Sequence, residues 1–187
     1  MKLVAILFSL ASVSAQTPPL PPGLYAVFHT SQGEITAKLY EKYTPIAVKN
    51  FVALAQGDKP WWDVETRAIV KRPLYDNITF HRVIPGEMIQ AGPSCGVHIR
   101  DEFLPGLRFD RPGRLAVANT GDPDSGGCGF FITTGIVLRW NEKYTSFGEV
   151  VAGQDVADKI GRGRVHEEKP VEPVKLIGVT IQRVVKP

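Results

Sequence analysis

The sequence has little of what defines several large classes of protein. It contains only two cysteines and two methionines, and its 22 basic and 19 acidic residues leave a net charge of +3. The Lys and Arg residues are spread along the chain, so we expect no nucleic-acid partner. A charged fraction of 22% and a hydrophobic fraction of 43% argue against wholesale disorder. The length of 187 residues is typical of one domain.

Common catalytic and ligand-binding motifs are also missing. The chain has no Ser-His-Asp signature, no glycine-rich phosphate loop before a helix and no CxxC pair. His81 and His98 would be metal ligands only if the fold brought them together, and a structural or surface role is the stronger interpretation. The acidic loop at residues 121–127 lacks the spaced ligands and the terminal Glu of a calcium loop. We therefore expect no metal and no cofactor.

The N-terminus has the pattern of a targeting segment. Lys2 precedes an apolar run over residues 3–10, and Val13-Ser14-Ala15 places small residues before Gln16. The run is too short to span a bilayer, which takes a helix of about 20 residues. The alternative is a buried N-terminal helix. We predict a signal peptide at 1–15, a Pro-rich arm at 16–23, export to the periplasm or the medium, and a mature protein without a membrane span.

Glycine and proline are plentiful, at 18 and 15 residues, which favours turns and short elements. Alternating or apolar segments predict short strands at residues 24–30, 34–40, 78–84, 88–91, 114–118, 130–134 and 174–184, and residues 146–151 lead toward a second helix. Thr44-Pro45 is predicted to cap and open a helix that Gly57 ends, and a second short helix is expected at 155–160. Residues 58–73 are predicted to be a loop carrying Trp61 and Trp62.

These elements predict one mainly β domain over residues 24–185. Many short strands with two helices suit a closed or nearly closed antiparallel barrel whose ends the helices cover. We expect a monomer.

A series of motifs in fixed order resembles the cyclophilin family of peptidyl-prolyl cis-trans isomerases. The central motif is Phe80-His81-Arg82-Val83-Ile84-Pro85-Gly86, followed by Met88-Ile89-Gln90-Ala91-Gly92. Further matches are at residues 101–103, 109–113, 116–119, 129–133, 143–151 and 153–160, so the resemblance covers about residues 24–184. It implies an eight-stranded antiparallel barrel capped by two helices, with a groove on its outside that binds an X-Pro bond.

The resemblance also implies roles for individual residues. Arg82 is the expected catalytic group, a fixed cation whose N–H donors stabilise the twisted amide. The expected substrate-binding residues are Met88, Gln90, Ala118, Asn119, Phe131, Trp140 and Tyr144. For Arg82 the alternative is a surface salt bridge, and for Met88 and Phe131 it is plain core packing. The reaction needs no cofactor.

Two departures from the family pattern bear on these roles. Glu87 stands where the family usually has a Phe that lines the proline pocket, and it would either pair with Arg82 or turn outward while an aromatic residue fills the gap. The two loops that border the pocket for residues upstream of the proline are altered, and each carries one cysteine. We therefore predict a Cys95–Cys128 disulfide, with two buried thiols as the alternative.

The resulting hypothesis is an exported prolyl isomerase that acts on proline-containing segments of unfolded or partly folded proteins. Two other functions stay open. One is a peptide-binding or chaperone module whose turnover Glu87 has weakened. The other is an interaction module that uses Trp61 and Trp62.

Overall fold

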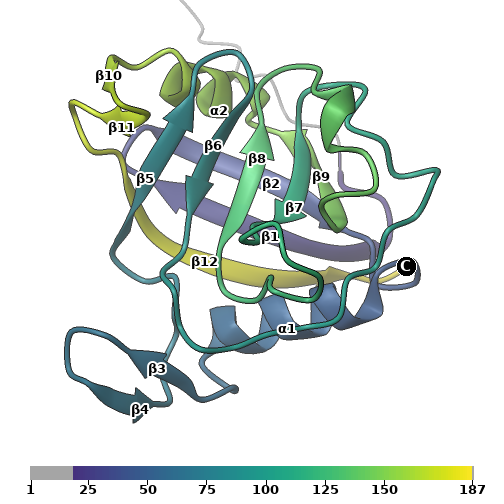
Figure 1. Ribbon diagram of the computed structural model, residues 1–187. Helices are drawn as coiled ribbons and strands as arrows, with labels where there is room; N and C mark the ends of the chain where they lie inside the picture. The colour runs from purple at the N-terminus through teal and green to yellow at the C-terminus, as the bar shows by residue number, and fades with distance from the viewer. Residues whose placement is uncertain (1–18, 187) are drawn as a thin grey trace, which may run out of the picture.

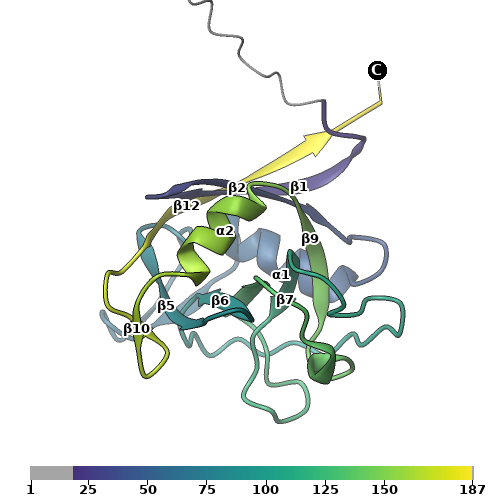
Figure 2. The ribbon, with the colours of Figure 1, turned by 90° about the horizontal axis from the view of Figure 1, so that it is seen from above.

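The central element of the protein is a closed antiparallel barrel of eight strands, seen from two directions in Figures 1 and 2. A computed structural model describes residues 19–186. The strands are β1 (Gly23–Thr30), β2 (Gly33–Leu39), β5 (Ile78–Ile84), β6 (Met88–Ala91), β7 (Arg114–Val117), β8 (Phe130–Thr133), β9 (Ser146–Ala152) and β12 (Lys175–Val184). They pair in the order β1-β12-β5-β6-β8-β7-β9-β2, and β2 closes the ring on β1. The predicted barrel is confirmed.

The N-terminal predictions fall largely outside this range. Residues 1–15, the predicted signal peptide, and residues 16–18 of the arm lie outside the described residues. The end of the arm contacts the domain, because the Tyr25 hydroxyl donates a hydrogen bond of 2.7 Å to the Pro21 carbonyl. Within residues 19–186, no helix has the length and apolar character needed to cross a membrane.

Two helices cover the barrel, α1 (Pro45–Gln56) at one end and α2 (Gln154–Gly161) at the other (Figure 1). Gly57 ends α1 at φ 75°, as predicted, because a residue without a Cβ adopts the left-handed conformation easily. This conformation lets the N–H groups of Gly57 and Asp58 turn back and donate to the carbonyls of Leu54 and Ala53. The predicted Thr44 cap is wrong, since its side chain makes no capping hydrogen bond. The Glu102 carboxylate caps the helix instead, accepting the N–H groups of Ile46 at 3.2 Å and Ala47 at 2.9 Å.

Residues 58–73, predicted as a loop, contain a hairpin of β3 (Trp61–Asp63) and β4 (Ala68–Val70). Trp61 faces inward and donates its indole N–H to the Arg72 carbonyl at 2.9 Å. Trp62 is 43% exposed on the opposite face.

A second hairpin joins β10 (Val165–His166) to β11 (Lys169–Pro170) and lies beside β5 (Figure 1). A 3-10 turn spans Leu138–Trp140.

An aromatic cluster fills the barrel and ties α1 to it. Phe51 of α1 packs against Tyr75, Phe147 and Phe130, at ring-centroid distances of 5.0, 5.1 and 5.8 Å. Phe28 lies 5.2 Å from Phe130. Since successive residues of a strand point to opposite faces, burying Phe130 inside directs Phe131 to the outer surface. The core thus sets the orientation of the strand that carries a predicted site residue.

Candidate active site

A row of four residues crosses four neighbouring strands on the outside of the barrel. Arg82 of β5 pairs with Gln90 of β6, Gln90 pairs with Phe131 of β8, and Phe131 pairs with Ala116 of β7. Directly paired residues share one face of a sheet. The inward neighbours in the same strands, such as Ile89 and the Phe130 ring, belong to the barrel core. The structure therefore brings a charged, a polar and an apolar side chain together on one outer face.

The turn between β5 and β6 places the next residues of this face. Pro85 and Gly86 occupy its centre, Gly86 has φ 76°, and the Glu87 N–H donates to the Ile84 carbonyl at 3.0 Å. This is the geometry that a Pro-Gly pair favours. Met88 follows, 2% exposed, on the same outer face as Phe131.

Met88 and Phe131 belong to an apolar cluster separate from the barrel core. Its buried members are Met88, Phe109, Ala116, Phe131 and Val137, with Ile84, Ala118, Trp140 and Tyr144 packed around them. The Phe131 ring is 3% exposed, because three aromatic rings surround it. Their centroids lie 5.1 Å away for Tyr144, 5.2 Å for Trp140 and 5.9 Å for Phe109. Trp140 and Tyr144, both half-buried, form the outer surface of this cluster.

Arg82 is held by two partners. Its Nε–H donates to a carboxylate oxygen of Glu168 at 2.6 Å, and its Nη1 lies 3.4 Å from Gln90 Oε1. The side chain is 44% exposed, so its remaining N–H donors are accessible from solvent. The pKa of the adjacent His81 is lowered by two effects. The larger is the partial burial of its ring, and the smaller is the positive charge of Arg82.

The predicted groove residues Ala118 and Asn119 lie where β7 ends. The Ala118 N–H donates to the Gly129 carbonyl at 2.9 Å. The Asn119 side-chain amide donates to the Lys143 carbonyl at 2.9 Å, and its oxygen accepts the Gly121 N–H at 3.2 Å. Asn119 thus links this loop to the segment that carries Tyr144.

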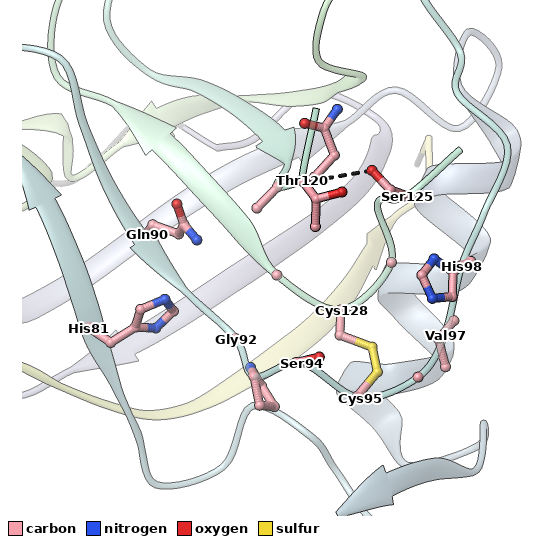
Figure 3. Close-up of a pocket in the computed structure, with 16 residues that line it drawn as sticks. His81, Gln90, Gly92, Ser94, Cys95, Val97, His98, Thr120, Ser125 and Cys128 are labelled. Carbon is pink, nitrogen blue, oxygen red and sulfur yellow. Dashed lines mark hydrogen bonds between the residues drawn. A yellow bond between two sulfur atoms is a disulfide. The ribbon is translucent and has the colours of Figure 1, made fainter. Parts of the chain in front are cut away.

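A pocket of about 270 Å³ continues from Gln90 along the outside of the barrel (Figure 3). His81 and Gln90 lie on one side of it, His98 and Val97 on the other, and the Cys95–Cys128 disulfide at its base. The predicted disulfide is therefore present, with 6.1 Å between the two Cα atoms. His81 and His98 share the pocket but stand on opposite sides of it (Figure 3). Within residues 19–186, no group of three or more His, Cys, Asp and Glu side chains is placed to hold a metal ion.

Glu87 pairs with Arg139 and not with Arg82. The Arg139 guanidinium in turn lies over the Trp140 ring, 5.4 Å from its centroid. An ion pair stacked on an indole thus stands at the edge of the apolar cluster where a Phe was expected from the family pattern.

Sequence reasoning missed four residues of this region. Phe109 and Val137 complete the apolar cluster, Arg139 binds Glu87, and Glu168 binds Arg82. Phe109 was part of a recognised motif, which was a usable indication of its place. Glu168 lies 86 residues from Arg82 in the sequence, and no local pattern links the two.

The fold and the outer row define a barrel of the cyclophilin class, and comparison with known proteins agrees. The family model described as cyclophilin type peptidyl-prolyl cis-trans isomerase/CLD matches residues 25–181. The chain belongs to this family, and it is a peptidyl-prolyl cis-trans isomerase of the cyclophilin type. It is 40% identical to the probable peptidyl-prolyl cis-trans isomerase A of Mycobacterium leprae, over 83% of this chain and 91% of the relative.

Three further likenesses come from a second bacterial sequence and from two solved structures of one protein. The peptidyl-prolyl cis-trans isomerase B of Streptomyces anulatus is 38% identical, over 85% of this chain and 97% of the relative. A crystal structure of a Cryptosporidium parvum cyclophilin type peptidyl-prolyl cis-trans isomerase matches with a TM-score of 0.74 and 25% identity, over 86% of this chain and 98% of that one. The same protein in the presence of the dipeptide Ala-Pro matches with a TM-score of 0.73.

Proposed function

We propose that this protein is exported and accelerates X-Pro rotation in unfolded or partly folded exported polypeptides, with Arg82 as its catalytic residue. The observation that carries the proposal is the outer row in which Arg82, Gln90 and Phe131 lie side by side on β5, β6 and β8. A cation with free donors next to an apolar surface is the combination that an X-Pro bond needs. The structure of the relative with Ala-Pro supports a proline-containing ligand.

The chemistry needs only binding and electrostatics. Rotation about an amide breaks its partial double bond, with a barrier of about 18–20 kcal/mol, and makes no new bond. In the twisted state the prolyl nitrogen regains its lone pair. The Arg82 guanidinium is positively charged and carries several donors, so it can hold the substrate carbonyl and interact with that nitrogen as resonance is lost. An interaction that strengthens in the twisted state lowers the barrier.

The proline ring is proposed to bind against the apolar cluster. Met88 and Phe131 form the floor, and Trp140 and Tyr144 border it. Gln90 orients Arg82, since its side-chain oxygen faces Nη1 at 3.4 Å. Ala118 and Asn119 edge the groove toward the pocket of Figure 3, where residues upstream of the proline are proposed to bind.

Export is supported by the N-terminal pattern and by the Cys95–Cys128 disulfide, which is typical of oxidising compartments. The test is the mass of the protein recovered after expression with its full sequence. A chain that begins at Gln16 and lies outside the cytoplasm supports export, and an intact chain retained in the cytoplasm contradicts it. Sedimentation of the same material tests the expected monomer.

Isomerisation of a short X-Pro peptide tests the catalytic proposal. We expect Arg82→Ala to lower kcat/KM by about 10²–10³, the range found when one donor to a developing charge is removed. Arg183→Ala is the matched control, because Arg183 also forms an exposed ion pair, with Glu41 at 2.8 Å, on another part of the barrel. Equal activity of the wild type and Arg82→Ala contradicts the role of Arg82.

Glu87→Phe tests whether the protein is instead a weakened peptide-binding module. An inactive wild type that Glu87→Phe activates supports this second function. We expect the wild type to be active, because Glu87 is paired with Arg139 and leaves Arg82 to the substrate. The third hypothesis, an interaction module built on Trp61 and Trp62, loses one of its two residues, since Trp61 is only 6% exposed.

A further inference from the structure

The β10–β11 hairpin contacts two consecutive residues of β5 through one residue of its own. The Glu168 carbonyl accepts the Val83 N–H at 2.7 Å, and the Glu168 carboxylate accepts the Arg82 Nε–H at 2.6 Å. The first contact fixes the hairpin against the strand (Figure 1). The second places a carboxylate on the guanidinium that the proposed function makes catalytic.

The backbone of this turn is unusual for the residues it contains. His166 pairs with Lys169, so Glu167 and Glu168 form a two-residue turn with φ values of 49° and 62°. Turns with positive φ at both positions strongly prefer Asn or Gly, because the Cβ clashes with the backbone at positive φ, Gly has no Cβ, and Asn tolerates this conformation better than most residues. Residues kept in a disfavoured backbone conformation cluster at functional sites. Glu168 reaches Arg82 from such a position.

The two partners of Arg82 bind different nitrogen atoms of its guanidinium. Glu168 accepts the Nε–H, and the side-chain oxygen of Gln90 lies near Nη1. The remaining N–H donors are left for a peptide. An exposed arginine otherwise samples many rotamers, and ordering it on binding the twisted amide would cost conformational entropy. Fixing the guanidinium in advance removes that cost from the reaction.

We propose that Glu168 is a positioning residue for the isomerase reaction, whose carboxylate orients the Arg82 guanidinium toward the bound peptide. The inference rests on the proposed function, because it acts through Arg82. Glu168 itself does not need to touch the substrate. Its loss should therefore lower kcat more than it raises KM.

Glu168→Asn is the test variant and Glu167→Asn its matched control. Asn is well tolerated at positive φ, so both changes preserve the turn. The Glu168→Asn side chain lacks the charge and the length to hold Nε. Glu167 occupies the neighbouring position and forms no side-chain hydrogen bond or ion pair with residues 19–186. We expect kcat for a short X-Pro peptide to fall about three- to tenfold in Glu168→Asn, with KM changed by less than about twofold. Glu167→Asn should match the wild type.

Two readouts separate positioning from a merely structural role. Solvent exchange of the Arg82 Nε–H, followed by NMR, should accelerate in Glu168→Asn and not in Glu167→Asn, while both keep the wild-type thermal midpoint. In an Arg82→Ala background, Glu168→Asn should have no further effect on kcat. Glu168→Gln, which keeps the length and one acceptor oxygen, should retain more activity than Glu168→Asn.

The outcomes are distinguishable. If Arg82→Ala is as active as the wild type, the proposed function of Arg82 fails. If activity depends on Arg82 but Glu168→Asn and Glu167→Asn have equal kcat, the positioning role fails alone. Higher kcat in Glu168→Asn also overturns it, because Glu168 would then compete with the substrate for the guanidinium. A Glu168→Gln variant less active than Glu168→Asn contradicts it as well.

Discussion

The Cys95–Cys128 disulfide closes a segment in which the two cysteines are 33 positions apart. For a loop of this size, chain entropy predicts a stabilisation of about 3–4 kcal/mol at 25 °C. Both side chains are buried, at 3% and 4% exposure. Replacing both by Ala therefore also removes packing, which adds about 1 kcal/mol to the loss. Serine is the poorer substitute, because it would bury two hydroxyl groups.

The native loops should survive without the cross-link. The Ile99 N–H donates to the Gly126 carbonyl at 2.8 Å, and the Trp62 N–H donates to the Cys95 carbonyl at 3.0 Å. The first bond joins the Cys95 loop to the Cys128 loop, and the second ties the Cys95 loop to β3, so both loops stay anchored when the sulfurs are separated. The double variant should consequently fold, with a lower free energy of unfolding.

Urea unfolding of three samples measures the two contributions separately. The samples are oxidised wild type, reduced wild type and the Cys95→Ala/Cys128→Ala variant. The first two differ only in the cross-link, and the last two differ only in the side chains. We expect reduction alone to remove about 3–4 kcal/mol. For a chain of this length, that corresponds to a fall of roughly 6–16 °C in Tm. A difference below about 1 kcal/mol between the unfolding free energies of oxidised and reduced wild type refutes the reasoning. A mass measurement that finds two free thiols in the native protein refutes it as well.

The same variant has a defined effect on activity. The disulfide lies at the base of the pocket in Figure 3, next to the candidate active site but outside the outer row of Arg82, Gln90 and Phe131. A peptide extended upstream of the proline should show a raised KM in the double variant. A minimal X-Pro peptide should show kcat close to that of the wild type.

Two further predictions concern stability. Glu102→Ala removes the carboxylate that accepts two N–H groups of α1, and it should cost about 1 kcal/mol in urea unfolding; an unchanged midpoint contradicts the capping role. Glu149 is partly buried, which acts against ionisation, but hydrogen bonds from Arg111 and Tyr40 and the charges of Arg111 and Arg114 lower the pKa of its carboxyl below the ordinary 4.5. A lowered folded-state pKa stabilises the fold above the unfolded value and loses that effect as the pH falls through the folded value. The unfolding free energies of wild type and Glu149→Gln should therefore differ most above the unfolded-state pKa and converge as the pH falls through the lowered folded-state pKa; a difference that does not change with pH contradicts this prediction.

The strands were predictable where one face of the strand is exposed to solvent and the other is buried. In β2, inward Ile35, Ala37 and Leu39 alternate with outward residues, and the predicted range nearly matches the observed one. β7 and β8 are buried on both faces, so their sequences show no alternation that separates inside from outside. Hydrophobic patterning alone would have missed that Phe131 faces outward, and only the family resemblance supplied its place in the site.

The failures of prediction share a physical cause, which is that the deciding contact comes from a distant part of the chain. Thr44 is a good cap by residue type, but the Glu102 carboxylate reaches the same N–H groups from another loop. The β3–β4 hairpin has strands of only three residues, too short for an alternation to stand out. Trp61 is buried there because Arg72 accepts its indole N–H and lies over its ring.

The ion pair with Arg82 that the sequence suggested for Glu87 is formed by a different residue. Strand register puts Gln90, and not Glu87, opposite Arg82, while the Pro85-Gly86 turn carries Glu87 to the side where Arg139 lies. A carboxylate in the central motif therefore need not weaken turnover. The carboxylate that does bind Arg82 is Glu168, on a hairpin that no motif identified. Glu168 accepts the Nε–H of Arg82 and leaves the Nη donors to other partners. A carboxylate at this position is therefore proposed to orient Arg82, whereas one that took the Nη donors would compete with the peptide.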